Sequence, residues 1–160
     1  MTRSSSRAHP AGRRGLTIIE LMIGVAIVAV LVAVAVPQYV GYVRRTEVKQ
    51  AVVDIRMFEM RIGHYRTEMA ALPNDLGGML DSLPSDPWGN PYQYLNLQSG
   101  EPGLDAESRK DKNLVPINSD YDLYSKGPDG ESWAPLTAAQ SLDDVVRANN
   151  GSFVGLAEDY

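Results

Sequence analysis

The sequence of 160 residues contains no cysteine. This absence excludes a disulfide framework, a cysteine nucleophile, covalent haem attachment and thiolate metal sites. It does not establish a reducing compartment, since an exported protein can fold without disulfides. A small domain outside the cytoplasm would then need another way of fastening its loops.

Basic residues are scarce beyond the N-terminus. The whole chain has a net charge of −5, and the first fifteen residues contribute +4, so the remainder carries −9. The four basic residues of this N-terminal segment are Arg3, Arg7, Arg13 and Arg14. An acidic body lacks the basic face that binds nucleic acid, so we expect no nucleic-acid partner.

Histidine is also scarce, since His9 and His64 are the only two. His9 falls in the basic N-terminal segment, and His64 lies on an expected helix, where we interpret it as a surface or packing residue rather than a base. The sequence has no Ser-His-Asp order, phosphate-binding loop or HExxH motif. We therefore expect no enzymatic activity.

One long apolar run extends from Leu16 to Val36, and its only polar side chains are those of Thr17 and Glu20. As a helix it would be about 31 Å long at ~1.5 Å per residue, enough to cross a hydrocarbon core of ~30 Å. The arginines before it predict a cytoplasmic N-terminus and a body on the other side of the membrane.

Three interpretations of this run compete. It could be a secretory signal cleaved after the small residues "AVA" at 33–35, an uncleaved anchor, or a pilin-type segment whose leader is cut before the apolar run. Glu20 discriminates between them, because a charge within a membrane helix costs ~2.5–3.5 kcal/mol at the centre and less near the interface. Neither a signal nor an anchor needs that charge.

The helical pattern continues beyond the apolar run. Apolar residues recur at spacings of three and four, which predicts an amphipathic helix that packs on a soluble domain. Pro37 lies between the two halves, where we expect it to kink or locally melt the helix. The residues of this stripe are Val48, Val52, Ile55, Phe58, Ile62, Tyr65 and Met69.

The stretch "GLTIIEL" at Gly15–Leu21 resembles the prepilin-peptidase motif of type IV pilins and type II secretion pseudopilins. The resemblance implies cleavage between Gly15 and Leu16 by a prepilin peptidase, which also N-methylates the new Leu16 amine. Glu20 would then lie one helical turn from a cationic amine and could pair with that of a neighbouring subunit, so that a wrong register in the fibre core is penalised. The other interpretation of Glu20 is an incidental interfacial carboxylate that reaches water.

The second half of the chain predicts a small sheet. Turn formers such as Pro73, Gly77, Gly78 and Pro84 allow at most a short helix at 75–83. Strands are expected over 92–97 and 121–125, an exposed charged loop over 98–113, and additional packing surface from the tail after 144. We interpret Trp88 as a packing residue where the loop meets the sheet, with an aromatic ligand platform as the alternative.

The expected fold is α+β and type IV pilin-like: a long N-terminal helix packed on a small antiparallel sheet, followed by a C-terminal loop. Its parts are a leader (1–15), a transmembrane and polymerisation helix (16–36), an amphipathic helix (37–70) and a head with loops and sheet (71–160).

Two head motifs, "DPWGNPYQY" at 86–94 and "DLYSKGPDG" at 122–130, resemble the head of the major pseudopilin of type II secretion systems. The resemblance implies a structural subunit that is stored in the inner membrane with its head in the periplasm. It polymerises through its N-terminal helix and drives the export of folded proteins across the outer membrane. The implied partners are further copies of the chain, minor pseudopilins and an inner-membrane assembly platform. The alternatives are a pilin-like subunit of a surface fibre and a secreted monomeric binding module.

Acidic residues near the C-terminus suggest a metal site. Calcium prefers six to eight oxygen ligands, and on spacing alone these residues fit either a calcium site or solvated loop acids. The family resemblance implies structural calcium held by Asp129, Asp143, Asp144 and the backbone carbonyl of Lys126, with Ser125 as a further ligand. This sequence departs from the family in the twelve residues that separate Gly130 from Asp143.

Overall fold

The computed structural model describes residues 15–79 and 84–160. They divide into two compact units, with the boundary between Gly41 and Tyr42. The predicted leader lies outside the described residues except for Gly15, and so does the end of segment 75–83, for which the sequence allows at most a short helix. Residues 75–79 form turns rather than a helix.

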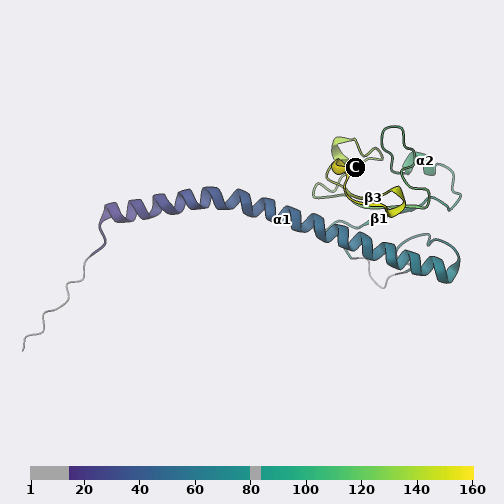
Figure 1. The fold of residues 1–160 in the computed structure, drawn as a ribbon, viewed down its shortest axis with the longest axis horizontal. Coiled ribbons are helices and arrows are strands. Elements are labelled where there is room, and N and C mark those ends of the chain that lie inside the picture. The colour runs from purple at the N-terminus through teal and green to yellow at the C-terminus, as the bar shows by residue number, and fades with distance from the viewer. Residues whose placement is uncertain (1–14, 80–83) are drawn as a thin grey trace, which may run out of the picture. The chain divides into compact units, whose positions relative to one another are not determined.

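The described residues contain a long helix, a short helix, four strands and three 3-10 turns (Figure 1). These elements are α1 (Ile18–Met69), β1 (Gln93–Asn96), α2 (Leu104–Glu107), β2 (Tyr121–Ser125), η1 (Ala139–Ser141), β3 (Val145–Ala148), η2 (Asn149–Gly151), β4 (Phe153–Leu156) and η3 (Ala157–Asp159). The long helix and the antiparallel sheet confirm the α+β, pilin-like fold class.

Helix α1 continues through Pro37. A proline in a helix lacks one backbone donor and crowds the preceding turn, which led us to expect a kink or local melting. The structure keeps residues on both sides of Pro37 helical, so the proline removes one hydrogen bond without ending the helix.

The four strands form an antiparallel sheet in the order β1-β2-β3-β4. The turn between β3 and β4 uses the sequence Asn149-Asn150-Gly151, in which all three residues have positive φ angles. Asparagine and glycine adopt this left-handed conformation at the lowest cost, which explains why the chain reverses here. The sequence analysis predicted β1 and β2, whereas it treated β3 and β4 only as extra packing surface.

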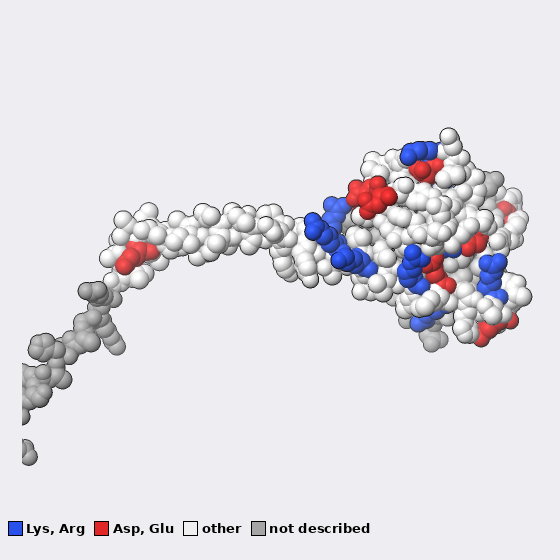
Figure 2. Space-filling model, viewed as in Figure 1, with Lys and Arg blue, Asp and Glu red and all other residues white. Residues whose placement is uncertain are grey.

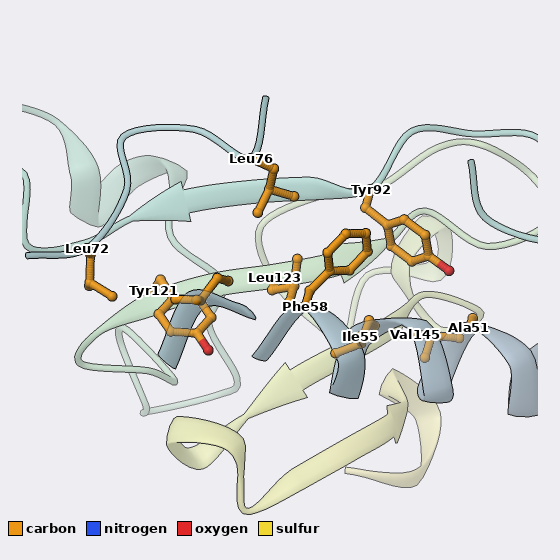
Figure 3. Packing of buried hydrophobic residues seen from close by; sticks show 10 residues of the cluster. Ala51, Ile55, Phe58, Leu72, Leu76, Tyr92, Tyr121, Leu123 and Val145 are labelled. Atoms are coloured by element: carbon orange, nitrogen blue, oxygen red, sulfur yellow. The ribbon is translucent and has the colours of Figure 1, made fainter. Parts of the chain in front are cut away.

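One face of the sheet packs on the second half of α1. Ala51, Ile55, Phe58 and Ile62 of α1 are almost completely buried. Figure 3 shows the first three of them facing Leu123 and Val145 of the sheet. The Phe58 ring meets the Tyr92 ring edge-on at a centroid distance of 5.1 Å. The predicted stripe is therefore confirmed at its centre, with Val48 and Val52 partly buried beside it and Ala51 added to it.

The end of that stripe was predicted wrongly. Met69, in the last turn of α1, is 61% exposed. Leu72 and Leu76 from the loop that follows α1 are buried in the same cluster, so they complete the core that Met69 was expected to cover.

Loops cover the opposite face of the sheet. Val146 and Ala148 of β3 pack there with Ile117, Leu136 and Ala157. The segment 98–113, which we expected to be an exposed loop, contains α2 and buries Ser108 and Arg109. Its charged residues misled the prediction, because Arg109 is neutralised inside the protein rather than by water.

An ion-pair network fastens α1 to the sheet. Arg147 of β3 donates hydrogen bonds to Glu59 of α1 at 2.8 Å, to both carboxylate oxygens of Asp120 at 2.8 Å and to the carbonyl of Tyr121 at 2.9 Å. Its guanidinium also lies 3.9 Å from the centre of the Tyr121 ring. Arg147 thus joins three segments that are far apart in sequence.

Candidate functional site

The apolar half of α1 exposes its side chains. Every large apolar residue between 16 and 36 is at least 51% exposed, and Figure 2 shows this stretch as uncharged apart from one acidic group near its start. Among the described residues, α1 is the one helix long and apolar enough to cross a membrane. Such a surface is unstable in water, so it must be covered by lipid or by other protein chains.

Thr17 and Glu20 form a reciprocal cap at the start of α1. The backbone N–H and the hydroxyl of Thr17 donate to Glu20 Oε2 at 2.9 and 2.8 Å, and the Glu20 N–H donates to Thr17 Oγ1 at 3.2 Å. This is a capping box, in which two unpaired helix-end donors are satisfied by side chains. The sequence "TIIE" at 17–20 has the spacing of this motif, which we did not predict.

The predicted cleavage site lies just before the cap. Residues 15–17 are not helical, and Leu16 is 75% exposed. No atom beyond its chain neighbours comes within 4 Å of a Cβ built at Gly15. The bond between Gly15 and Leu16 is therefore in exposed, non-helical backbone.

In the head, the two sequence motifs interlock. Asp86 accepts hydrogen bonds from the N–H groups of Trp88 and Asn90 with one oxygen and from the Ser125 hydroxyl with the other. The Asn90 side-chain amide donates to the carbonyl of Gly127 at 2.9 Å. Asp86 and Asn90 thus join the first motif to the second, a role that the sequence analysis did not assign to them.

Trp88 packs against the core cluster, which confirms the packing interpretation. Its indole N–H donates to Glu47 of α1 at 3.1 Å. His64 is an exposed residue on α1 whose Nδ1 lies 3.3 Å from Glu68, which confirms its surface location.

The C-terminal loop brings Asp129 and Asp143 together. Burial raises the pKa of Asp143, and the negative charge of Asp129 raises it further. Gly127 has φ +65, and a Cβ at this position would overlap the backbone carbonyl of Asp143. The glycine therefore permits the close approach of the two halves of the loop.

The other predicted ligands are arranged differently. Asp144 is fully buried, and its Oδ2 accepts hydrogen bonds from Arg109 at 2.5 Å and from Ser132 at 2.6 Å. Burial raises the pKa of Asp144 to about 6, while the Ser132 hydrogen bond and the Arg109 charge oppose that rise. The Ser125 hydroxyl donates to Asp86 and accepts from the Gly127 N–H.

These positions give a partial fit to calcium. Within residues 15–79 and 84–160, no group of three or more acidic or histidine side chains is arranged to hold a metal ion. Two neighbouring carboxylates are present, and Asp144 Oδ1 is a buried oxygen without a hydrogen-bond partner in the described part of the chain. Calcium would need backbone carbonyls and water to complete its six to eight ligands.

Comparison with known proteins extends these observations. Residues 10–36 match the prokaryotic N-terminal methylation motif. The chain is 31% identical to the type II secretion system core protein G of Escherichia coli (strain K12) over 140 residues, which cover 74% of this chain and 84% of that protein. It is 30% identical to the protein of the same name from Pseudomonas aeruginosa over 138 residues, which cover 73% of this chain and 84% of that protein. A fimbrial protein of Pseudomonas aeruginosa is 51% identical over only 43 residues, 27% of this chain and 28% of that protein.

A methylation motif, an exposed apolar helix and an antiparallel sheet packed on the same helix define a subunit of the type IV pilin-like class. Within this class, the match to fimbrial protein is confined to a short segment, whereas the match to core protein G includes most of both chains. The chain belongs to the family of type II secretion system core protein G, the major pseudopilins.

Proposed function

We propose that this chain is the structural subunit of a type II secretion pseudopilus, polymerising through its N-terminal helix to drive export of folded proteins across the outer membrane. The family relationship supports this function. The observation that carries it is the helix surface over residues 16–36, which no part of the described chain covers. Lipid covers this surface in the stored subunit, and the helices of neighbouring copies cover it in the polymer.

The stored subunit is a single-pass protein of the inner membrane, with its N-terminus in the cytoplasm and its head in the periplasm. The arginines of the leader support this orientation. A prepilin peptidase removes the leader between Gly15 and Leu16 and methylates the Leu16 amine. The methylation motif and the exposed, non-helical backbone at this bond support that processing step.

Glu20 has two roles in the proposed assembly. One carboxylate oxygen caps its own helix through Thr17. The other oxygen is available to the Leu16 amine of a neighbouring subunit. Since an unpaired charge in an apolar core costs several kcal/mol, this pairing favours one register of the polymer.

The remaining partners follow from the proposed assembly, namely minor pseudopilins and an inner-membrane assembly platform. The chain has a structural role in it rather than an enzymatic one. The alternative within the class is a subunit of a surface fibre, which the short match to a fimbrial protein favours only for the N-terminal part. A secreted monomeric module is the alternative from another class.

N-terminal analysis of the mature protein tests the processing step. A chain that begins at methylated Leu16 is expected, whereas a chain that begins at Val36 would refute the proposal. Glu20→Leu should process normally but fail to form pseudopili when overproduced. Thr17→Val is the matched control, because it removes the hydroxyl part of the cap but keeps the Thr17 N–H bond to Glu20 and the carboxylate itself, so it should still assemble.

Calcium is the proposed structural cofactor of the C-terminal loop. Asp129 and Asp143 would hold it together with the Lys126 carbonyl, and Asp144 would contribute through Oδ1. The proximity of Asp129 and Asp143 and the unpartnered Oδ1 support this assignment, whereas the engaged Ser125 hydroxyl argues against a contribution from Ser125. When bound, the ion would neutralise carboxylates that otherwise repel each other.

The calcium assignment is tested by melting the full chain in detergent with calcium or with chelator. At a free calcium concentration one hundred times Kd, binding stabilises the folded state by ~2.7 kcal/mol. Calcium should therefore raise the melting temperature. Asp129→Ala should abolish this response, and Glu101→Ala, an exposed acid in the loop after β1, should retain it. Identical melting curves in both conditions would rule calcium out.

A further inference from the structure

Arg109 is a buried arginine within a run of charged residues. It is 1% exposed, and the two carboxylates nearest to it, Asp122 and Asp144, are 1% and 0% exposed. A buried guanidinium is stabilised when its charge is paired and its donors are hydrogen-bonded; in the described part of the chain Arg109 meets this through both Nη atoms, while its Nε has no hydrogen-bond partner. Its partners therefore show what it holds together.

The guanidinium of Arg109 contacts both ends of the twelve-residue segment 131–142. Near the first end, Nη1 donates to Ser132 Oγ and to the Trp133 carbonyl, both at 2.6 Å. Just after the second end, Nη2 donates to Asp144 Oδ2 at 2.5 Å. The guanidinium also lies 4.3 Å from the centre of the Tyr124 ring in β2, so it fixes both ends of the segment against the sheet.

The backbone around Arg109 is fixed in the same place. The Arg109 N–H donates to Asp122 Oδ2 at 2.6 Å, and the following residue, Lys110, exchanges backbone hydrogen bonds with residues 134 and 136. Inside the segment, the Trp133 N–H donates to Ser141 Oγ at 2.8 Å, and the Ser141 hydroxyl donates back to the Trp133 carbonyl. The Trp133 carbonyl thus accepts from Ser141 and from Arg109 at one point.

We infer that Arg109 is an internal cation that fastens the C-terminal loop, residues 126–144, to the sheet, so that this loop keeps its conformation without a bound metal ion. The guanidinium supplies the positive charge that buried Asp144 requires. Its planar set of donors also reaches the Trp133 carbonyl, so one side chain holds both positions. The inference concerns the metal-free protein and stands whether or not calcium binds at Asp129 and Asp143. A subunit built in this way keeps its head folded in surroundings low in calcium.

Hydrogen exchange of the full chain in detergent micelles tests this role. The Trp133 amide donates to Ser141 across segment 131–142, so its protection reports that the C-terminal loop is intact. The amides of β2 serve as an internal reference for the sheet. With chelator present, the Trp133 amide of the wild-type protein should be protected. In Arg109→Met it should exchange at least tenfold faster, while Lys112→Met, an exposed lysine three residues away, should leave it unchanged.

Two results would overturn the inference. In the first, the wild-type Trp133 amide is protected only after calcium alone is added to the chelated protein, which would make the metal the fastener. In the second, Arg109→Met and Lys112→Met give the same exchange rate. If Arg109→Met does not fold, Arg109→Lys is measured instead, because lysine keeps the charge but cannot reach Asp144 and Trp133 together. Unchanged Trp133 protection in that variant would equally overturn the inference.

Discussion

Replacing Arg147 by methionine should destabilise the head more than any surface charge change. Arg147 is 4% exposed, and four of its hydrogen bonds connect α1, the 120–121 segment and β3. Removing one partner of a buried ion pair costs about 3–5 kcal/mol, since the other partner stays charged without compensation. Glu59 and Asp120 retain some contact with water, so we expect about 3 kcal/mol, at the lower end of that range.

Thermal unfolding of the full chain in detergent measures this loss. For a domain of this size, about 3 kcal/mol corresponds to a decrease in melting temperature of about 10 °C or more. Fluorescence of Trp88 in a Trp133→Phe background reports the head, because Trp88 packs on the core and Trp133 is exposed. The control is Arg56→Met, which removes an exposed partner of the same Glu59 and should cost less than about 1 kcal/mol. If the two variants melt at the same temperature, the ion-pair network of Arg147 does not stabilise the head as proposed.

Three further predictions concern the core, the loop and acid stability. Phe58→Ala should lower the free energy of unfolding by about 3–5 kcal/mol in urea titrations, because Phe58 is fully buried against Tyr92. Gly127→Ala should cost at least about 1–2 kcal/mol from its positive φ alone and should selectively expose the C-terminal loop to limited proteolysis. Burial raises the pKa of Asp120, but hydrogen bonds and the charge of Arg147 outweigh it and leave the pKa below the ordinary 3.8. The resulting stabilisation is present above about pH 4 and lost below it, so wild type and Asp120→Asn should converge in stability in acid.

Periodic patterns allowed much of the fold to be predicted. The spacing of apolar residues identified the buried row of α1, and the β propensity of Tyr92, Tyr94 and the nearby leucines identified β1. The stretch centred on residues 121–125 identified β2. Strands β3 and β4 have four residues each, and β3 carries Arg147 at its centre. Short strands with a buried charge have no clear alternation, so their pairing depends on contacts distant in sequence.

The candidate sites were predicted less completely for the same reason. Asp129 and Asp143 lie close together, and both belong to the loop in which the sequence placed candidate ligands. The partner of Asp144 is instead Arg109, which is 35 residues away in a charged stretch. No local pattern distinguishes a buried arginine from its exposed neighbours. The Thr17–Glu20 cap is a local motif that the sequence does show, and it was overlooked because Glu20 was interpreted only as a partner for another subunit.

The position of that cap has a consequence for how the subunit is made. Because α1 begins only after Thr17 and its first turn is closed by side chains that lie beyond the scissile bond, a peptidase acting after Gly15 would cut backbone that takes no part in the helix. The helix would therefore have the same end before and after processing. On the proposed processing, the precursor would already have the capped helix start of the mature subunit, and cleavage would add a cationic amine just before it.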